Sequence, residues 1–440
     1  MFQQTSSDSS GNPPAPRQSR RSFLATSGAA TAGVAGVFAA QLAGIRQSVA
    51  AVSQQVESVS EDRFATLAKQ YSVADSVNYL NHAAIGTIPR PVQAAFQQYV
   101  ELCESNPWLH IWGDAWDEPL AHTRELAAEA LGCRSSDVAI THNTTEMFNT
   151  LALGLPLKAD DEVLFSTLNH AGASLPFTER AKLGKFRVRR FAFPTDSLPG
   201  ITADEIVAAH AAEISPRTRL LVFPHIDNTV GIRHPVKEIA DMARERGVEF
   251  IAVDAAQTAG MLKLDSAAMN VDVLATSGHK WLGGPKGTGL AYVNGRIHDT
   301  LQPLSVTWGQ AQWSGSARRY EDYGTRNMPD VLALDDAMTF LQKLTWRQRE
   351  DRLRDLWSFT QGLVEQADSL SWTSPDDWKL AGSLYSIRVS RPAGALSRKL
   401  FNERGIVVRP FSNLGLNNLR VSPNVFTSKS EIEEFIRAVA

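Results

Sequence analysis

Short apolar runs alternate with amphipathic stretches along the middle of the chain. Runs rich in β-branched and aromatic residues, bounded by turn residues such as Asp160-Asp161, predict buried strands. The predicted strands cover 162–167, 186–193, 219–223 and 249–253, and the predicted helices between them cover 173–183, 202–213 and 236–246. Because these strands are apolar on both faces and helices separate them, the pattern predicts an α/β fold with a mostly parallel sheet covered on both sides.

The pattern changes after residue 328. Two long helical stretches come first, and shorter strands and a closing helix follow them. The predicted helices cover 329–343, 345–368 and 428–439, and the predicted strands cover 384–389, 406–409 and 419–422. We therefore expect a large domain over 51–328 and a smaller α+β domain over 329–440, with segment 51–90 packing on the smaller one.

Composition narrows the class of protein. A chain of 440 residues with 21% charged and 43% hydrophobic residues is typical of a two-domain globular enzyme. The 44 basic and 47 acidic side chains give a net charge of −3, so no basic surplus exists to bind nucleic acid. Two cysteines, Cys103 and Cys133, cannot by themselves build a disulfide framework or a structural zinc site, and we expect no metal.

The first 50 residues differ from the rest, since they carry a charge of +3 against −6 for the remainder. Ser19-Arg20-Arg21-Ser22-Phe23-Leu24 precedes an uncharged stretch that runs to Ile45 and is rich in Ala and Gly. This arrangement resembles a twin-arginine export signal, and Ser48-Val49-Ala50 predicts a mature start near Ala51. The resemblance implies a periplasmic or extracellular enzyme; the alternative is an uncleaved membrane anchor over the same stretch.

The densest chemical signal lies between Val253 and Gly289. Asp254 ends a predicted strand, where ligands bind in open α/β sheets, and Lys280 follows 26 positions later after Ser277-Gly278-His279. One chemistry uses both groups: a lysine aldimine whose electron sink is a pyridinium nitrogen kept protonated by a carboxylate. The glycines from 283 to 289 lack the Lys-Ser/Thr ending of a P-loop, and a tight turn beside the site is the better interpretation.

Several ordered segments resemble the class V aminotransferase family of pyridoxal-phosphate enzymes. Tyr79-Leu80-Asn81-His82-Ala83-Ala84, continuing to Pro89, is closest to the isopenicillin N epimerase-like branch of that family. The other matching segments are Thr144-Thr145-Glu146 with Asn149, Asn169-His170 with Pro176-Phe177, and His225-Ile226-Asp227-Asn228 with Gly231. The resemblance implies the fold of pyridoxal-phosphate transferases of fold type I, with a seven-stranded type of sheet in the large domain.

The resemblance also implies a role for each matching residue. Pyridoxal 5'-phosphate would be held by Thr144, Thr145, His170, Asn228, Asp254, Gln257, Ser277, His279, Lys280 and, from a neighbouring subunit, Thr325. Within this set Lys280 bonds to the cofactor and moves the Cα proton, Asp254 pairs with the ring nitrogen, Gln257 binds the phenolic oxygen and His170 stacks on the ring. Arg420 would bind the substrate carboxylate, and we expect His82 on the substrate side as well. His82, Tyr323 or a residue of a neighbouring subunit could serve the second face. The shared Thr325 implies a homodimer.

Physical arguments favour some of these roles and offer simpler interpretations of others. Thr144-Thr145 precede the apolar run from 147 to 153, and a helix N-terminus there favours a phosphate dianion. Taken alone, Thr144 to Glu146 could be a capping box, Asp254 a turn residue and His170 an ordinary polar residue. The order of all the segments together favours the cofactor site.

The cofactor leaves the reaction open. Cysteine desulfurases need a thiol ahead of the carboxylate-binding arginine, and residues 408–415 contain none, which disfavours that activity. We expect an epimerase or transaminase acting on an amino acid or an amino-acid-containing peptide. The alternatives are a carbon–sulfur or other amino-acid lyase, and a non-catalytic binding protein that kept the fold. Five tryptophans could form an apolar substrate pocket or simply pack: Trp108, Trp112, Trp116, Trp308 and Trp313.

Overall fold

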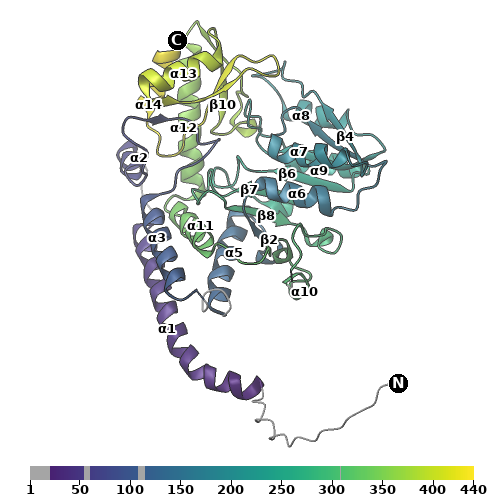
Figure 1. Ribbon diagram of the computed structural model, residues 1–440. Coiled ribbons are helices and arrows are strands. Elements are labelled where there is room, and N and C mark those ends of the chain that lie inside the picture. The colour runs from purple at the N-terminus through teal and green to yellow at the C-terminus, as the bar shows by residue number, and fades with distance from the viewer. Residues whose placement is uncertain (1–19, 54–59, 108–113, 308) are drawn as a thin grey trace, which may run out of the picture.

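A seven-stranded sheet forms the centre of the computed structural model, which describes residues 20–53, 60–107, 114–307 and 309–440 and, for residues 20–35, the helical backbone alone (Figure 1). The strand order is β2 (Val138–Thr141), β8 (Gly289–Val293), β7 (Val273–Ser277), β6 (Phe250–Asp254), β5 (Thr218–Pro224), β3 (Glu162–Ser166) and β4 (Arg187–Phe191). β8 alone runs opposite to the other six strands of this sheet. The predicted α/β class with a mostly parallel sheet is therefore confirmed.

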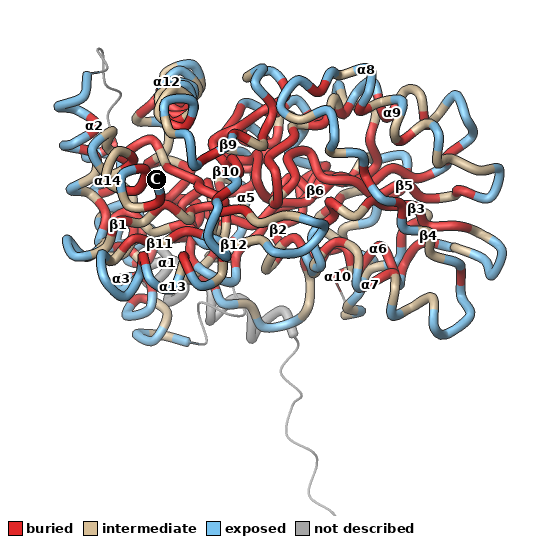
Figure 2. The backbone as a smooth tube through the Cα atoms, turned by 90° about the horizontal axis from the view of Figure 1, so that it is seen from above, coloured by how far each residue is buried: buried red, intermediate tan, exposed pale blue. Residues whose placement is uncertain are grey.

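Alternate side chains of each strand enter two different apolar clusters. In β3, Val163 and Phe165 pack with α6 (Thr144–Gly154) and α7 (Ala171–Ala181), whereas Leu164 faces the opposite cluster. That opposite cluster includes α3 (Arg90–Ser105), α5 (Asp117–Leu131), α8 (Ala203–Ala211), α9 (Val236–Glu245) and α11 (Met328–Leu341). Because both faces are covered, the strands other than β4 form a buried band in Figure 2. The expectation of strands apolar on both faces is wrong for β4, an edge strand whose Arg187 and Arg190 are exposed.

The C-terminal part is built around a second, antiparallel sheet. Its strand order is β12 (Arg409–Phe411), β13 (Asn418–Val421), β10 (Tyr385–Val389) and β9 (Leu370–Trp372). The helices of this part are α12 (Trp346–Glu365), α13 (Ala393–Arg404) and α14 (Lys429–Val439). The short strand β1 (Asn78–Tyr79) pairs in parallel with β11 (Ile406–Val407), which ties the segment after α2 (Glu61–Ala68) to this part of the chain.

The long first helix α1 (Arg20–Val52) is part of the folded body over its C-terminal half, where it lies beside α3 and α11 (Figure 1). Phe38, Leu42, Ile45 and Val49 are buried at a helical spacing, and Phe38 meets Trp116 edge to face at 5.1 Å between ring centroids. A chain that began at Ala51 would lose all four of these contacts.

A buried charge cluster also joins α1 to its neighbours. Arg46 donates to Asp335 on α11 at 3.3 Å, and the same carboxylate oxygen contacts His122 at 2.7 Å and accepts from Thr123 at 2.9 Å. Within the described part of the chain, no helix is long and apolar enough to cross a membrane. The side chains of Arg20 and Arg21, together with Ser19, lie outside the residues whose placement is described.

Candidate active site

The candidate site residues follow the carboxyl ends of five strands of the large sheet. Asp254 ends β6, Lys280 follows β7, His170 follows β3 and Asn228 follows β5. Thr144 begins α6 just after β2. These strands run in the same direction, so their carboxyl ends meet at one edge of the sheet, where open α/β sheets bind ligands.

Lys280 lies in an environment that disfavours its charge. Burial lowers the pKa of its amino group to about 8; Asp254 opposes that shift and Arg420 adds to it. A lysine with a lowered pKa is partly neutral at physiological pH, so it can act as a nucleophile and a proton carrier. The same electrostatic contacts show that the fold brings Lys280, Asp254 and Arg420 together from distant parts of the chain.

His170 joins this group from the start of α7. Its Nδ1 accepts the Gly172 N–H at 3.1 Å, which fixes the ring at the helix N-terminus with Nε2 protonated in the neutral form. His170 is exposed, yet desolvation still lowers the pKa of its ring. Asp254 opposes that shift, and the cations Lys280, Arg420 and Arg409 add to it.

The N-terminus of α6 forms the anionic end of the site. The Thr144 N–H donates to Ser277 Oγ at 3.2 Å, and the two hydroxyls lie 2.9 Å apart. Thr145 is exposed beside Gly172, where an added Cβ would lie 2.4 Å from Thr145 Oγ1. His279 Nδ1 is buried without a partner among the described residues. The hydroxyls and the helix dipole together suit a phosphate.

Arg420, on β13, is fixed at the other end of the site. Its Nη1 donates to the Asn228 carbonyl at 2.7 Å and its Nη2 to Asn81 Oδ1 at 2.9 Å, while Phe411 lies against the guanidinium at 5.5 Å. Burial and the nearby Arg409 lower the pKa of Arg420 to about 10, so it stays charged at neutral pH. A buried cation with spare N–H groups is suited to a carboxylate.

Gln257 and His82 are buried next to the lysine segment but already have protein partners. Gln257 donates to the Ala83 carbonyl and accepts from Trp281 Nε1, each at 2.9 Å, so one amide N–H is left for a ligand. His82 Nδ1 lies 3.2 Å from the Ser422 carbonyl, which makes it the protonated nitrogen and leaves Nε2 as an acceptor. Burial lowers the pKa of His82 to about 4, so it is neutral at physiological pH.

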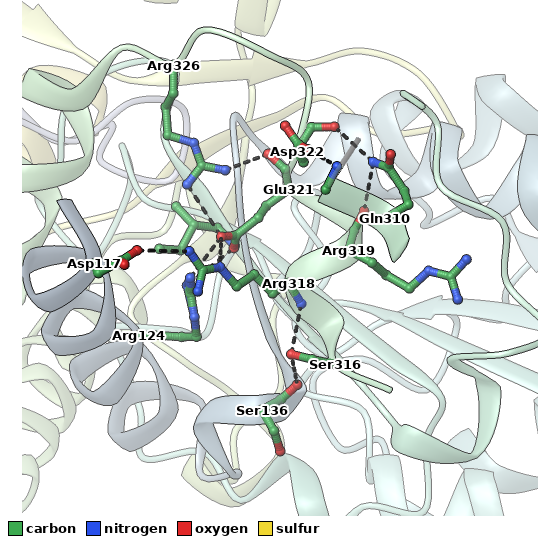
Figure 3. Close-up of polar contacts among 12 residues, drawn as sticks. Asp117, Arg124, Ser136, Gln310, Ser316, Arg318, Arg319, Glu321, Asp322 and Arg326 are labelled. Atoms are coloured by element: carbon green, nitrogen blue, oxygen red, sulfur yellow. Dashed lines mark hydrogen bonds and ion pairs between the residues drawn. The ribbon is translucent and has the colours of Figure 1, made fainter. Parts of the chain in front are cut away.

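The segment that carries Thr325 does not join these groups within one chain. Thr325 is exposed, and the segment is anchored by Glu321, whose carboxylate accepts from Arg124 at 2.9 Å and from the Ile140 N–H at 2.9 Å (Figure 3). Tyr323 packs its ring against His142, at 4.4 Å between centroids.

Two of the five tryptophans pack against other side chains of the protein, which favours a structural role over a substrate pocket. Trp116 packs on Phe38 in the helical layer, and Trp313 lies 4.3 Å from the guanidinium of Arg318. Trp108, Trp112 and Trp308 lie outside the described residues. Among the described residues, no group of three or more His, Cys, Asp or Glu side chains is arranged to hold a metal ion.

Two residues of the site received no role from the sequence. Asn81 contacts Arg420, and Gly86 lies so close to the lysine segment that a Cβ would be 2.0 Å from the Lys280 carbonyl oxygen. Both stand in the segment from Tyr79 to Pro89 that resembles the family. Their place inside a matching segment was the only sign in the sequence that they belong to the site. Their partners, Arg420 and Lys280, lie far away along the chain.

The sequence profile described as Aminotransferase class-V matches residues 78–437. The chain belongs to the class V aminotransferase family. A curated isopenicillin N epimerase from Amycolatopsis lactamdurans is 29% identical over 394 residues, covering 86% of this chain and 98% of the relative. A probable cysteine desulfurase from Pyrococcus abyssi is 25% identical, covering 84% and 94% respectively.

Solved structures share the fold of this family member. The cystine C–S lyase C-DES in complex with cysteine persulfide superposes with a TM-score of 0.75 at 24% identity, covering 83% of this chain and 97% of that one. A C-DES mutant with glycine covalently linked to the PLP cofactor gives 0.74 at 23% identity, covering 87% and 99%. The chain has the fold type I architecture of pyridoxal-phosphate enzymes, and pyridoxal 5'-phosphate is its cofactor.

The residues of this chain fit that cofactor. The start of α6, with Thr144, Thr145 and Ser277, offers donors for the phosphate, and Asp254 offers a buried carboxylate within electrostatic reach of Lys280. The site therefore combines an anion-binding helix start, a buried carboxylate and a weakly basic amine, which are the groups that a phosphorylated pyridine aldehyde requires.

Proposed function

We propose that this class V pyridoxal-phosphate enzyme breaks and remakes a bond at the Cα of an amino acid or an amino-acid-containing peptide, as an epimerase or a transaminase. The cofactor, when bound, supplies the electron sink for that step. The observation that carries the proposal is Lys280, with its pKa lowered to about 8 beside Asp254 and Arg420. A neutral amine at this place can remove and return the Cα proton while Arg420 orients the substrate carboxylate.

The cysteines support this reaction over sulfur transfer. Cys103 lies in α3 and Cys133 directly after α5, whereas residues 408–415 contain no cysteine. Burial raises the pKa of Cys103 to about 11 and that of Cys133 to about 12, so neither is a thiolate at neutral pH. A persulfide-forming nucleophile has to be a thiolate close to the substrate. Replacing both cysteines by serine should therefore leave turnover within about twofold, since general thiol chemistry is not used.

His82 is our candidate for the second proton-transfer group. Its Nε2 is a buried acceptor without a partner among the described residues, and its ring lies 6.5 Å from that of Trp281, the neighbour of Lys280. Epimerisation needs an acid or base on each face of the reacting carbon, whereas transamination needs one group that moves a proton between two carbons. His82→Gln should therefore stop inversion more strongly than exchange of the Cα proton.

The test is a spectrum of the holoenzyme followed by incubation with L- and D-amino acids in deuterated water. The lysine-bound cofactor should show an absorbance band that shifts when a substrate is added, with deuterium entering Cα. Inversion without a keto acid identifies an epimerase, and a keto acid identifies a transaminase. Elimination products would indicate the lyase alternative. No band after reconstitution would leave only a binding protein with this fold.

We further propose a homodimer in which Thr325 reaches the phosphate site of the partner subunit. The exposed Thr325 on a segment anchored by Glu321 supports this arrangement, and so do the exposed side chains of Leu175 and Leu183 beside α6. Sedimentation or light scattering should give twice the mass of the 48.1 kDa chain. In a dimer, mixing Lys280→Ala and Thr325→Ala subunits should restore part of the activity, because one of the two shared sites is then intact.

Export by the twin-arginine route also remains a proposal, based on Arg20-Arg21 and the uncharged stretch that follows. Because Phe38, Leu42, Ile45 and Val49 are packed in the body, we propose that any cleavage takes place before Phe38 rather than at Ala51. A full-length fusion in which both arginines are replaced by lysine should lose export. Unchanged export would remove the support for this route, and the N-terminus of the exported protein would locate the cleavage site.

A further inference from the structure

The segment from Tyr79 to Gly86 lies between the two ends of the active site. On one side, the His82 N–H donates to the Ser422 carbonyl at 3.2 Å and the Ala83 N–H donates to Ser422 Oγ at 3.0 Å. On the other side, the Gly86 N–H donates to the His279 carbonyl at 2.7 Å. The segment therefore holds the strand that carries Arg420 against the loop that carries Lys280.

Asn81 is the residue of this segment that contacts Arg420 directly. Its orientation can be deduced, because a guanidinium only donates hydrogen bonds and the atom that faces Arg420 must be the amide oxygen. The amide NH₂ of Asn81 consequently points away from Arg420 Nη2. The side chain is only half-buried, and within the described residues its Nδ2 donates to no protein acceptor.

The surroundings of Arg420 explain why a neutral partner matters here. The guanidinium donates to a backbone carbonyl and to an amide oxygen, and none of its recorded hydrogen-bond partners is an acidic side chain. Its electrostatic neighbours include Arg409, a second cation, and the buried Asp227. The Asp227 carboxylate is occupied by the N–H groups of Thr229, Val230 and Ile232 at 2.6–2.8 Å. The positive charge is held in place without being neutralised by a direct partner.

We propose that Asn81 is a positioning and specificity residue for the substrate carboxylate. Its amide oxygen holds the guanidinium of Arg420 in place, and its amide N–H groups add a donor beside it, so that the two side chains together select an α-carboxylate. This inference rests on the proposed function and assigns part of its substrate recognition to a residue that the family resemblance left without a role. An aspartate at this place would have the same shape but would pair with Arg420 and repel the incoming carboxylate.

The test compares N81D and N81A with the wild-type holoenzyme. The control is N402D, which adds the same charge at an exposed position on α13. The spectral shift gives the dissociation constant for an amino-acid substrate and for its carboxamide analogue, which lacks the carboxylate. Calorimetry with a 2-hydroxy acid, which cannot bond to the cofactor, measures carboxylate binding independently of any reaction.

N81D should weaken binding of the amino acid and the hydroxy acid about 10- to 100-fold, because its carboxylate would pair with Arg420 and repel the substrate carboxylate. N81A should weaken it about 10-fold, because a hydrogen bond to a charged group is lost. Binding of the carboxamide, the band of the lysine-bound cofactor and the melting temperature should stay near wild-type values. N402D should change none of them. In an R420Q background, the effect of N81D should largely disappear, because the two residues act as a pair.

Equal losses for the carboxylate and the carboxamide would overturn the proposal and assign Asn81 a purely structural role. So would wild-type affinity of N81D for both carboxylates. If N81D does not fold, the N81A and N81S variants give the same comparison. Failure of the proposed function is distinguishable, since it would appear in the wild type as no spectral shift and no deuterium exchange, while the hydroxy-acid measurement would still report on Asn81.

Discussion

Buried charges are treated in two opposite ways in this protein. In the segment shown in Figure 3, Glu321 accepts from Arg124 and from a backbone N–H, and Arg326 lies 3.5 Å away. At the edge of the large sheet that carries the candidate site, Lys280 faces one carboxylate, Asp254, but also a second cation, Arg420. The first arrangement satisfies its charge from within the chain. The second leaves an excess of positive charge that a cofactor phosphate and a substrate carboxylate can balance.

This difference separates stability from function. A buried carboxylate with full compensation holds elements together, because removing one partner would leave an unpaired charge in a poorly solvated place. Unpaired buried donors and a buried amine such as that of Lys280 destabilise the fold. They are expected where a ligand supplies the missing partner. We therefore expect mutations in the two regions to give separate signatures, one in unfolding and one in catalysis.

The largest expected effect lies at the candidate site. Lys280→Ala should abolish the absorbance band of the lysine-bound cofactor and lower turnover by about 10²- to 10⁴-fold, because a proton-transfer group is removed. The melting temperature should change little. Lys263→Ala, at an exposed position, is the matched control and should keep both the band and the rate. Turnover that survived in Lys280→Ala would refute the catalytic assignment.

The second effect belongs to the paired region. Arg124→Met should lower the free energy of unfolding by about 3 kcal/mol, since Glu321 loses its forked partner in a buried place. Chemical denaturation measures this loss. Arg187→Met, which removes the partner of Asp160 from an ion pair with both side chains exposed, should be silent in the same assay. The cofactor spectrum of the folded Arg124→Met protein should match the wild type; a lost band would mean that the two regions are not separable.

The N-terminal helix extends the paired region and gives a third test. Leu42→Ala should lower the free energy of unfolding by about 2 kcal/mol, because a buried side chain between α1 and its neighbours is truncated. Ala43→Ser, on the exposed side of the same helix, serves as the control. If both variants unfold like the wild type, residues 36–53 contribute nothing to the stability of the body.

The smallest expected effect is a shift in the pH at which the apo-protein binds its cofactor. Only the neutral amine of Lys280 attacks an aldehyde, so the rate of capture by the apo-protein should rise about tenfold per pH unit and level off above about pH 8. An unperturbed lysine would level off near 10.4. Asp254→Asn should move the midpoint down and Arg420→Gln should move it up, as stopped-flow absorbance can show. A midpoint above pH 10 in the wild type would contradict the desolvated site.

Much of the large domain could be predicted from local pattern. The strands β3, β5 and β6 are continuous apolar runs that pair with their neighbours close to the predicted bounds. The pattern did not single out β2, β7 and β8, whose apolar runs include Thr, Ser or Gly. The antiparallel direction of β8 follows from its connection to β7, which is the turn from 278 to 288 and contains no helix.

The candidate site divides in the same manner. Lys280, Asp254, His170 and Thr144 could be recognised because each follows a strand or begins a helix, and the chain order of these segments is informative. Asn81 could not, since its partner Arg420 lies 339 residues further along the chain. The packing of residues 36–53 against the body could not be predicted either. Their sequence, rich in Ala and Gly, resembles a leader, and the surfaces that bury its larger side chains belong to α3 and α11.

The sequence alone determined the elements, their order and the chemical groups that the family uses, because each of these depends on residues close together in the chain. Tertiary structure decided which groups meet. It placed Arg420 beside Asn81 and Lys280 and left that cluster positively charged. It also paired the carboxylates of Glu321 and Asp335 with arginines from other helices. Burial and pairing depend on all the surfaces that pack together, and those surfaces come from segments hundreds of residues apart.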